Sequence, residues 1–151
     1  MAQELGSGIA QIVAQLGFEL SLTDVSDEIV HGGISRISSN LNKNVKKGKI
    51  SKEEANVILS RIKAAKDLNQ AVEGVDLVIE VAVENVEVKK QIFRELDRIC
   101  GKNVVFASNT STFSITELAS ATNRPESVIG MHFFNPATII KLVKLQMKRL
   151  T

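Results

Sequence analysis

The chain of 151 residues has the length of one domain, and its 44% hydrophobic and 24% charged residues are typical of globular rather than disordered proteins. A formal net charge of +2 is too small to indicate a nucleic-acid or membrane surface by itself. No apolar run approaches the roughly 20 residues that a membrane-spanning helix needs, and the basic start of a signal peptide is missing. We therefore expect a soluble, cytoplasmic protein that binds neither nucleic acid nor membrane.

Cys100 is the only cysteine, which excludes an intrachain disulfide. It falls at helical spacing with Phe93, Leu96 and Ile99, so packing in the core is favoured over catalysis. We expect no metal site.

The first half of the chain is predicted to hold three helices and one strand. The first helix ends at Gly17, and residues 18–24 (FELSLTD) form a short strand that ends in an acid. A long helix follows and ends at Gly48, and Ser51 with Glu54 has the spacing of a capping box at the start of the next helix. The apolar positions of the three helices are, in order, Ile9, Ile12, Val13 and Leu16; Val30, Ile34, Ile37, Leu41 and Val45; and Ala55, Ile58, Leu59 and Ile62.

The second half alternates strands and helices. The predicted strands are 74–82, 103–109, 127–134 and 139–147. The first of them, GVDLVIEVA, is a nearly continuous apolar run of the kind found in strands buried on both faces. Residues 86–100 form a helix, and Ser114 with Glu117 has capping-box spacing before a short helix through Ala121. This alternation predicts a Rossmann-like, doubly wound α/β domain over residues 1–151, with a mainly parallel sheet and a long helical excursion after the strand that ends at Asp24.

Gly-Ser-Gly at residues 6–8 suggests the phosphate-binding turn of a dinucleotide fold, in which glycines let the backbone approach a pyrophosphate at a helix N-terminus. The motif G-x-G-x-x-G is intact in neither register: read forward it meets Gln11, and read backward from Gly6 it meets Met1 and Gln3. A helix start without a ligand is the alternative.

Asp24 ends a strand about 20 residues after this turn, where an acid accepts hydrogen bonds from ribose hydroxyls. An acid there favours NAD over NADP, because it would repel a 2′-phosphate. An exposed turn aspartate is the alternative explanation.

Three stretches, EVAVENVEVKKQIF (80–93), ASNTSTFSITELA (107–119) and VIGMHFFNP (128–136), resemble the N-terminal domain of the NAD-dependent 3-hydroxyacyl-CoA dehydrogenases, in particular the bacterial 3-hydroxybutyryl-CoA dehydrogenases. GSGIAQ, KKGKIS and KLV fit the same pattern, and the resemblance runs from Gly6 to about Val143. It fixes the register of the glycine motif, so that Gly6 is its last glycine.

The resemblance implies a role for each matching residue. Glu84 and Lys89 match positions that contact the nicotinamide half of NAD, and Asn135 matches a residue that lines the same pocket and the substrate site. Lys47 falls near a lysine that contacts the coenzyme A phosphates, although Asn40 replaces the serine that usually accompanies it.

Ser111 and His132 match the family's active-site serine and catalytic base. Oxidation of a 3-hydroxyl requires removal of its proton, and an imidazole that titrates near neutrality can accept and return it. The serine hydroxyl would hold the substrate oxygen. Taken without the resemblance, a structural histidine and a turn serine are the alternatives.

The chain also departs from the family pattern. The leading strand and the first two glycines are missing, which would leave neighbouring strands with unpaired backbone groups that cost about 1–3 kcal/mol each when buried. We therefore expect another chain, most simply in a homo-oligomer, or a rearranged segment of this one to fill the gap.

The family motif K-L-V-E reads K-L-V-K here, so that Lys144 takes the place of the acid that holds the catalytic histidine. A lysine only donates hydrogen bonds and cannot accept one from an imidazole N–H. The alternative is a shifted strand register in which Lys144 points to solvent.

The chain ends at Thr151, before the family's helical second domain, so the sequence predicts a domain that is truncated at both ends. Three functions remain open: an NAD-dependent 3-hydroxyacyl-CoA dehydrogenase domain with Ser111 and His132 as its machinery, a module that binds NAD or acyl-CoA without catalysis, and a structural remnant.

Overall fold

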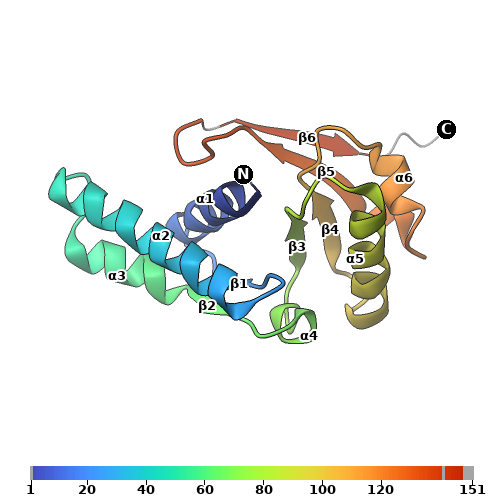
Figure 1. The fold of residues 1–151 in the computed structure, drawn as a ribbon, viewed down its shortest axis with the longest axis horizontal. Helices are drawn as coiled ribbons and strands as arrows, with labels where there is room; N and C mark the ends of the chain where they lie inside the picture. Colours follow the sequence, from blue (N-terminus) through green and yellow to red (C-terminus); the bar gives the residue numbers. More distant parts are fainter. Residues whose placement is uncertain (1, 141, 148–151) are drawn as a thin grey trace. The chain divides into compact units, whose positions relative to one another are not determined.

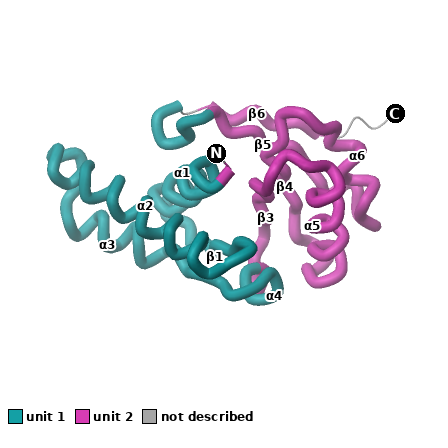
Figure 2. The backbone as a smooth tube through the Cα atoms, in the orientation of Figure 1, with its two compact units in different colours: residues 1, 3–71, 135–140 teal, residues 2, 72–134, 141–151 magenta. Residues whose placement is uncertain are grey.

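The computed structural model describes residues 2–140 and 142–147, which divide into two units (Figure 2). Unit 1 holds residues 3–71 and 135–140, and unit 2 holds residues 2, 72–134 and 142–147. Met1, which takes the place of the first motif glycine, lies outside the described residues, as do Lys141 and the tail 148–151.

Unit 1 is mostly helical and contains a two-stranded parallel sheet (Figure 1). Its elements are α1 (Ala2–Gln15), β1 (Leu20–Leu22), α2 (Asp27–Lys46), α3 (Lys52–Ser60), β2 (Ile62–Ala64) and α4 (Leu68–Ala71). One cluster of buried side chains joins α1, α2, α3 and β2, namely Ala10, Ala14, Ile37, Leu41, Ala55, Ile58 and Ile62. The helical stripes predicted from the sequence therefore form the core of this unit.

The phosphate-binding turn expected before Gly6 is replaced by helix. Helix α1 begins at Ala2, so Gly6 lies inside it instead of ending a loop. Ala2, Gln3 and Leu5 are good helix formers, and Glu4 sits in the first turn, where a negative charge is favourable. Local helix propensity thus extends α1 over the residues that the motif assigns to the turn.

The ends of α2 and α3 follow local rules. Gly48 has φ = 69°, the left-handed conformation that a glycine adopts readily after a helix. The capping box of α3 is complete: the Ser51 hydroxyl accepts the Glu54 N–H, and the Glu54 carboxylate accepts the Ser51 N–H. The expectation that α3 continues to Ile62 is wrong, because the chain leaves the helix after Ser60 and residues 62–64 pair with β1.

Unit 2 is a four-stranded sheet with helices (Figure 1). Its elements are β3 (Leu77–Glu80), α5 (Val86–Ile99), β4 (Val105–Ser108), α6 (Ile115–Ala119), the short 3-10 helix η1 (Pro125–Ser127), β5 (Val128–Phe133) and β6 (Val143–Met147). The strand order is β3-β4-β5-β6; the first two pairings are parallel and the last is antiparallel. The short connection between β5 and β6 explains this, because a parallel return needs a longer crossover.

Aromatic and aliphatic side chains pack α5 and α6 onto this sheet. The rings of Phe93 on α5 and Phe106 on β4 meet edge to face at 6.1 Å, and both residues are fully buried. Gly130 on β5 lies against α6: a Cβ there would come within 2.9 Å of the Ile115 side chain. The glycine therefore permits the close approach of α6 to the strand that carries His132.

Three details of unit 2 differ from the sequence predictions. Strand β3 lies at the end of its sheet, and Leu77 is 40% exposed, so the strand is not buried on both faces. Ser114 makes no side-chain capping bond at the start of α6. The Glu117 carboxylate accepts a hydrogen bond from Lys90, 2.8 Å away, which raises the pKa of Lys90. The last strand begins at Val143 rather than at residue 139.

The described strands form two sheets, with β1 paired to β2 and β3 at the end of the four-stranded sheet. From the sequence, we expected another chain, or a rearranged segment of this one, to fill the gap left by the missing leading strand. A single closed sheet would have contradicted this hypothesis, and the described strands do not form one. None of the helices in the described part of the chain is long and apolar enough to cross a membrane.

Candidate functional site

His132 lies near the end of β5 and is oriented by the segment that follows β4. Its Nδ1 lies 3.3 Å from the backbone oxygen of Asn109, which can only accept, so Nδ1 carries the proton in this contact. The Asn109 side chain also accepts the Phe133 N–H at 2.8 Å and ties the two strand ends together. With Nδ1 protonated in this contact, the lone pair of a neutral imidazole would lie on Nε2.

Lys144 on β6 is the cross-strand partner of His132. In an antiparallel pair, directly opposite residues project from the same face of the sheet with their Cβ atoms about 5 Å apart. The predicted alternative of a shifted register is therefore wrong, although Lys144 is exposed. The orienting contact seen for His132 comes from a backbone carbonyl.

Ser111 is exposed in the bend between β4 and α6. The residue before it anchors this bend: the Thr110 hydroxyl accepts the N–H groups of Thr112 (3.2 Å) and Phe113 (3.1 Å). The same hydroxyl donates to Glu84 at 2.9 Å. Ser111 is thus presented by a bend whose backbone is held from one side chain.

A buried ion pair lies behind this bend. The Lys89 side chain is 1% exposed, and its Nζ lies 2.8 Å from Glu80 Oε1 and 3.3 Å from Glu84 Oε1. The Ser108 hydroxyl donates to the other Glu80 oxygen at 2.6 Å. Removing one member of such a pair leaves a buried charge and costs about 3–5 kcal/mol.

Glu84 differs from Glu80 in its exposure. Its side chain is 45% exposed, against 3% for Glu80. Both of its oxygens contact the protein, one through Lys89 and the other through Thr110. Glu84 is therefore the member of this acidic pair that a ligand can reach.

The remaining predicted site residues belong to unit 1. Gly6 lies in α1, and a Cβ added there would meet no atom within 4 Å outside the neighbouring backbone of its own helix. Asp24 is exposed after β1, with one carboxylate oxygen 2.7 Å from the Val25 N–H. Lys47 is the exposed C-cap of α2, and Asn135 is exposed before a cis bond to Pro136.

These residues fit one part of a dinucleotide better than another. The second oxygen of Asp24 is an acceptor suited to a ribose hydroxyl. The helical backbone of residues 2–5 does not form the glycine turn that would cradle a pyrophosphate. In unit 1 the acid expected for the ribose is therefore exposed, whereas the phosphate turn does not have its expected shape.

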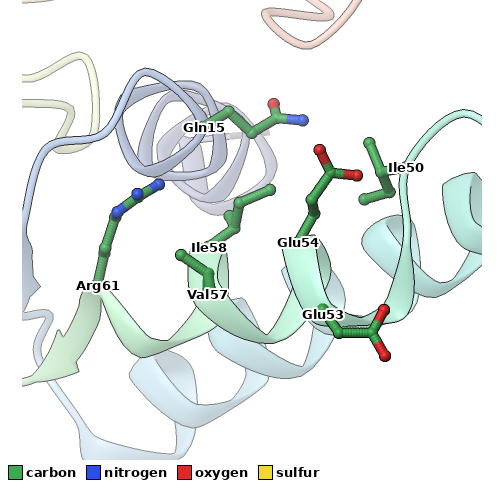
Figure 3. A pocket seen from close by; sticks show the side chains of 7 residues that line it. All are labelled: Gln15, Ile50, Glu53, Glu54, Val57, Ile58 and Arg61. Carbon is green, nitrogen blue, oxygen red and sulfur yellow. The ribbon is translucent and has the colours of Figure 1, made fainter.

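Unit 1 contains an open pocket of about 450 Å³. Figure 3 shows the side chains that line it: Gln15, Ile50, Glu53, Glu54, Val57, Ile58 and Arg61. None of the predicted site residues lines it. Its Arg61 guanidinium already donates to the Ala14 carbonyl at 2.8 Å, and Glu54 is engaged in the capping box of α3. Among residues 2–140 and 142–147, no group of three or more His, Cys, Asp or Glu side chains is arranged to hold a metal ion.

Glu80, Ser108, Asn109 and Thr110 are absent from the sequence-based site. Glu80 could have been found from the sequence, because Lys89 lies on the buried stripe of α5 four residues before Phe93. A lysine in such a position needs an acidic partner, and Glu80 is the only acid inside the apolar run 77–82. The sequence has no comparable pattern that would indicate the hydroxyl groups of Ser108 and Thr110 as partners.

Residues 3–151 match the family described as "3-hydroxyacyl-CoA dehydrogenase, NAD binding domain". A probable 3-hydroxybutyryl-CoA dehydrogenase of Bacillus subtilis is 43% identical over 95% of this chain and 50% of its own length. The 3-hydroxybutyryl-CoA dehydrogenase of Bradyrhizobium diazoefficiens is 44% identical over 95% of this chain and 49% of its own. The chain spans about half the length of the curated relatives it matches.

Among solved structures, the (S)-3-hydroxybutyryl-CoA dehydrogenase of Ralstonia eutropha is similar with a TM-score of 0.91 at 41% identity, over 95% of this chain and 50% of that one. This similarity confirms the predicted Rossmann-like α/β fold.

Proposed function

The chain belongs to the 3-hydroxyacyl-CoA dehydrogenase family, whose NAD-binding domain it matches, and we propose that it serves the NAD-dependent oxidation of a 3-hydroxyacyl-CoA, such as 3-hydroxybutyryl-CoA, to the 3-oxoacyl-CoA. The observation that carries this proposal is the orientation of His132. Its Nδ1–H donates to the Asn109 carbonyl, so Nε2 is the basic nitrogen, and Ser111 follows two residues after Asn109.

In the proposed reaction, His132 Nε2 accepts the proton of the substrate 3-hydroxyl. The Ser111 hydroxyl donates a hydrogen bond to the same oxygen and holds it beside the imidazole. Bound NAD would supply the acceptor for the hydride that leaves carbon 3. In the reverse direction, the imidazolium returns the proton to the oxygen.

We assign the cofactor contacts by the same proposal. Asp24 accepts hydrogen bonds from the adenosine ribose, and Gly6 keeps the position of the last motif glycine although helix α1 replaces the phosphate turn. Glu84 and Asn135 contribute to the nicotinamide side, where Lys89 acts through Glu84. These contacts favour NAD, because an acid at position 24 repels a 2′-phosphate.

Lys47 is proposed to contact the phosphates of coenzyme A. It is exposed at the C-terminus of α2, beside Lys46 and close in sequence to Lys49. Three ammonium groups around one turn attract the multiply charged phosphates of an acyl-CoA.

A second candidate is a domain that binds NAD or acyl-CoA without turnover. The His132–Lys144 pairing favours it, because the residue opposite the imidazole donates hydrogen bonds and accepts none. In this case the binding contacts remain while the proton transfer is lost.

Titration with NADH and acetoacetyl-CoA separates the two candidates. We expect NADH consumption that falls by roughly 100- to 10,000-fold in His132→Asn, the range for loss of a general acid–base. The matched control is His31→Asn on the exposed face of α2, which should leave the rate unchanged. Saturable NADH binding without turnover would support the second candidate, and absence of both binding and turnover would contradict both.

We further propose that the chain forms a homo-oligomer through the open edge of a sheet. Strand β3 lies at the end of its sheet, and an end strand offers N–H and C=O groups to a further strand. Light scattering should give a mass of two or more times the 16.5 kDa of one chain. A monomer at all concentrations would contradict this assembly.

A further inference from the structure

The buried Glu80–Lys89 pair is the start of a hydrogen-bonded chain that ends on the backbone beside Ser111. We call the five residues that form it the anchor network: Glu80, Glu84, Lys89, Ser108 and Thr110. They come from β3, the loop after β3, α5, β4 and the bend after β4. The network therefore joins consecutive elements of unit 2 at the C-terminal ends of two parallel strands.

Lys89 is fully occupied inside this network. Its ammonium contacts both oxygens of Glu80 at 2.8 and 3.1 Å, the Ala82 carbonyl at 3.1 Å and Glu84 Oε1 at 3.3 Å. An ammonium has three N–H donors, so these acceptors satisfy it. With 0% of the residue exposed, the Lys89 ammonium is enclosed by these acceptors, and the Glu84 carboxylate is one of them.

Two hydrogen bonds connect Thr110 to the rest of the anchor network. Its hydroxyl donates to Glu84 Oε2 at 2.9 Å, and its backbone N–H donates to the Ser108 hydroxyl at 3.3 Å. Ser108 in turn donates to Glu80 at 2.6 Å. Both routes lead back to Glu80, so the orientation of Thr110 depends on the buried pair.

The Thr110 hydroxyl oxygen accepts the N–H groups of Thr112 and Phe113. Ser111 therefore lies inside a turn that is closed by a single side chain. We propose that Glu80, Lys89 and Thr110 are positioning residues, which fix the bend around Ser111 and the carboxylate of Glu84 before any ligand binds. The catalytic part of this proposal rests on the proposed function, whereas the structural part stands on the contacts alone.

The test replaces the hydroxyl that closes the turn. Thr110→Val keeps the shape and removes the hydroxyl, Thr110→Ser keeps the hydroxyl, and Thr116→Val makes the same change at an exposed position of α6. Amide hydrogen exchange of the full chain is measured by NMR, without cofactor or substrate. We expect the Thr112 and Phe113 amides to exchange about tenfold faster in Thr110→Val and within about threefold of wild type in the other two variants.

Glu84→Met tests the hydrogen bond between Glu84 and the Thr110 hydroxyl. It removes the acceptor of the Thr110 hydroxyl at a half-exposed position, so the fold should be retained. The same two amides should again exchange faster, while the β4 amides stay protected. Unchanged exchange at Thr112 and Phe113, or an equal increase throughout β4 and β5, would overturn the proposal.

The kinetic measurement tests the link to catalysis. In Thr110→Val, kcat should fall by about 10- to 100-fold while KM for NADH changes by less than about threefold, because Lys89 still holds the Glu84 carboxylate and a displaced serine affects mainly the chemical step. Thr110→Ser should restore kcat. Faster exchange with an unchanged kcat would overturn the positioning role. A wild-type chain without turnover would contradict the proposed function. In that case the exchange measurement alone tests whether the anchor network fixes the bend around Ser111.

Discussion

His132 and Lys144 lie directly opposite each other in the antiparallel pairing of β5 with β6. The sequence placed Lys144 where the resembling family has an acid that holds the catalytic histidine, and the strand register puts it on the same sheet face as the imidazole. The contact that orients the ring is the Asn109 carbonyl, 3.3 Å from Nδ1. The imidazole therefore has a backbone acceptor and a cationic neighbour in place of a carboxylate.

Lys144→Glu should raise turnover. A carboxylate opposite His132 would stabilise the imidazolium formed when the substrate proton is taken up, and we expect kcat/KM with NADH and acetoacetyl-CoA to increase at least about tenfold. Lys144→Met removes the cation without adding an acceptor, and Lys102→Glu makes the same charge change in an exposed turn after α5. An equal increase in all three variants, or none in Lys144→Glu, would contradict the role assigned to position 144.

Arg124, which precedes η1 and whose side chain is 14% exposed, should contribute strongly to the stability of unit 2. Its guanidinium donates to the carbonyls of Asp97, Cys100 and Gly101 at the C-terminal end of α5, and its Nε lies 2.7 Å from Asp97 Oδ1. We expect Arg124→Met to lower the free energy of unfolding by about 1–3 kcal/mol, measured by urea denaturation. Arg94→Met, on the exposed face of α5, is the control and should stay within about 0.5 kcal/mol of wild type.

Asp97 should make part of this stability dependent on pH. Desolvation raises the pKa of Asp97, but hydrogen bonds from Asn123 and Arg124 outweigh it, and the pKa lies below its ordinary value. Its contribution to stability is therefore fully present above the unfolded-state pKa of about 3.9 and is lost as the pH falls through the lower folded-state value.

Unfolding at several pH values tests this dependence. Wild type should be more stable than Asp97→Asn at neutral pH, and the difference should shrink below about pH 4. A difference that stays constant down to acid unfolding would show that the carboxylate makes no charge-dependent contribution.

Two serines with the same sequence signature should differ in their effect on stability. Ser51 completes a capping box with Glu54, so Ser51→Ala should lower the free energy of unfolding by about 0.5–2 kcal/mol. Ser114 makes no capping bond, so Ser114→Ala should change it by less than about 0.5 kcal/mol. Thermal or urea unfolding of the pair measures the difference, and equal losses would contradict the assignment.

These two serines show which structural features can be predicted from short sequence patterns. Helical spacing and capping residues located α2, α3 and α5 correctly, because the hydrophobic stripe and the cap depend on residues within a few positions of each other. The same rule failed at Ser114, where Glu117 reaches across to Lys90 on α5. It failed again at Ile62, which belongs to a strand because β1 offers a partner 42 positions earlier in the register Leu20–Ile62.

The sequence by itself determined the alternation of strands and helices and the family-matched positions of Ser111 and His132, since each is carried by a contiguous stretch of the chain. Only the tertiary structure decided which groups those residues meet. The pairing of His132 with Lys144 depends on strand register, and the burial of Lys89 against Glu80 depends on how α5 packs on β3. Hydrogen bonds act over about 3 Å, so partners from different elements are set only when packing brings those elements together.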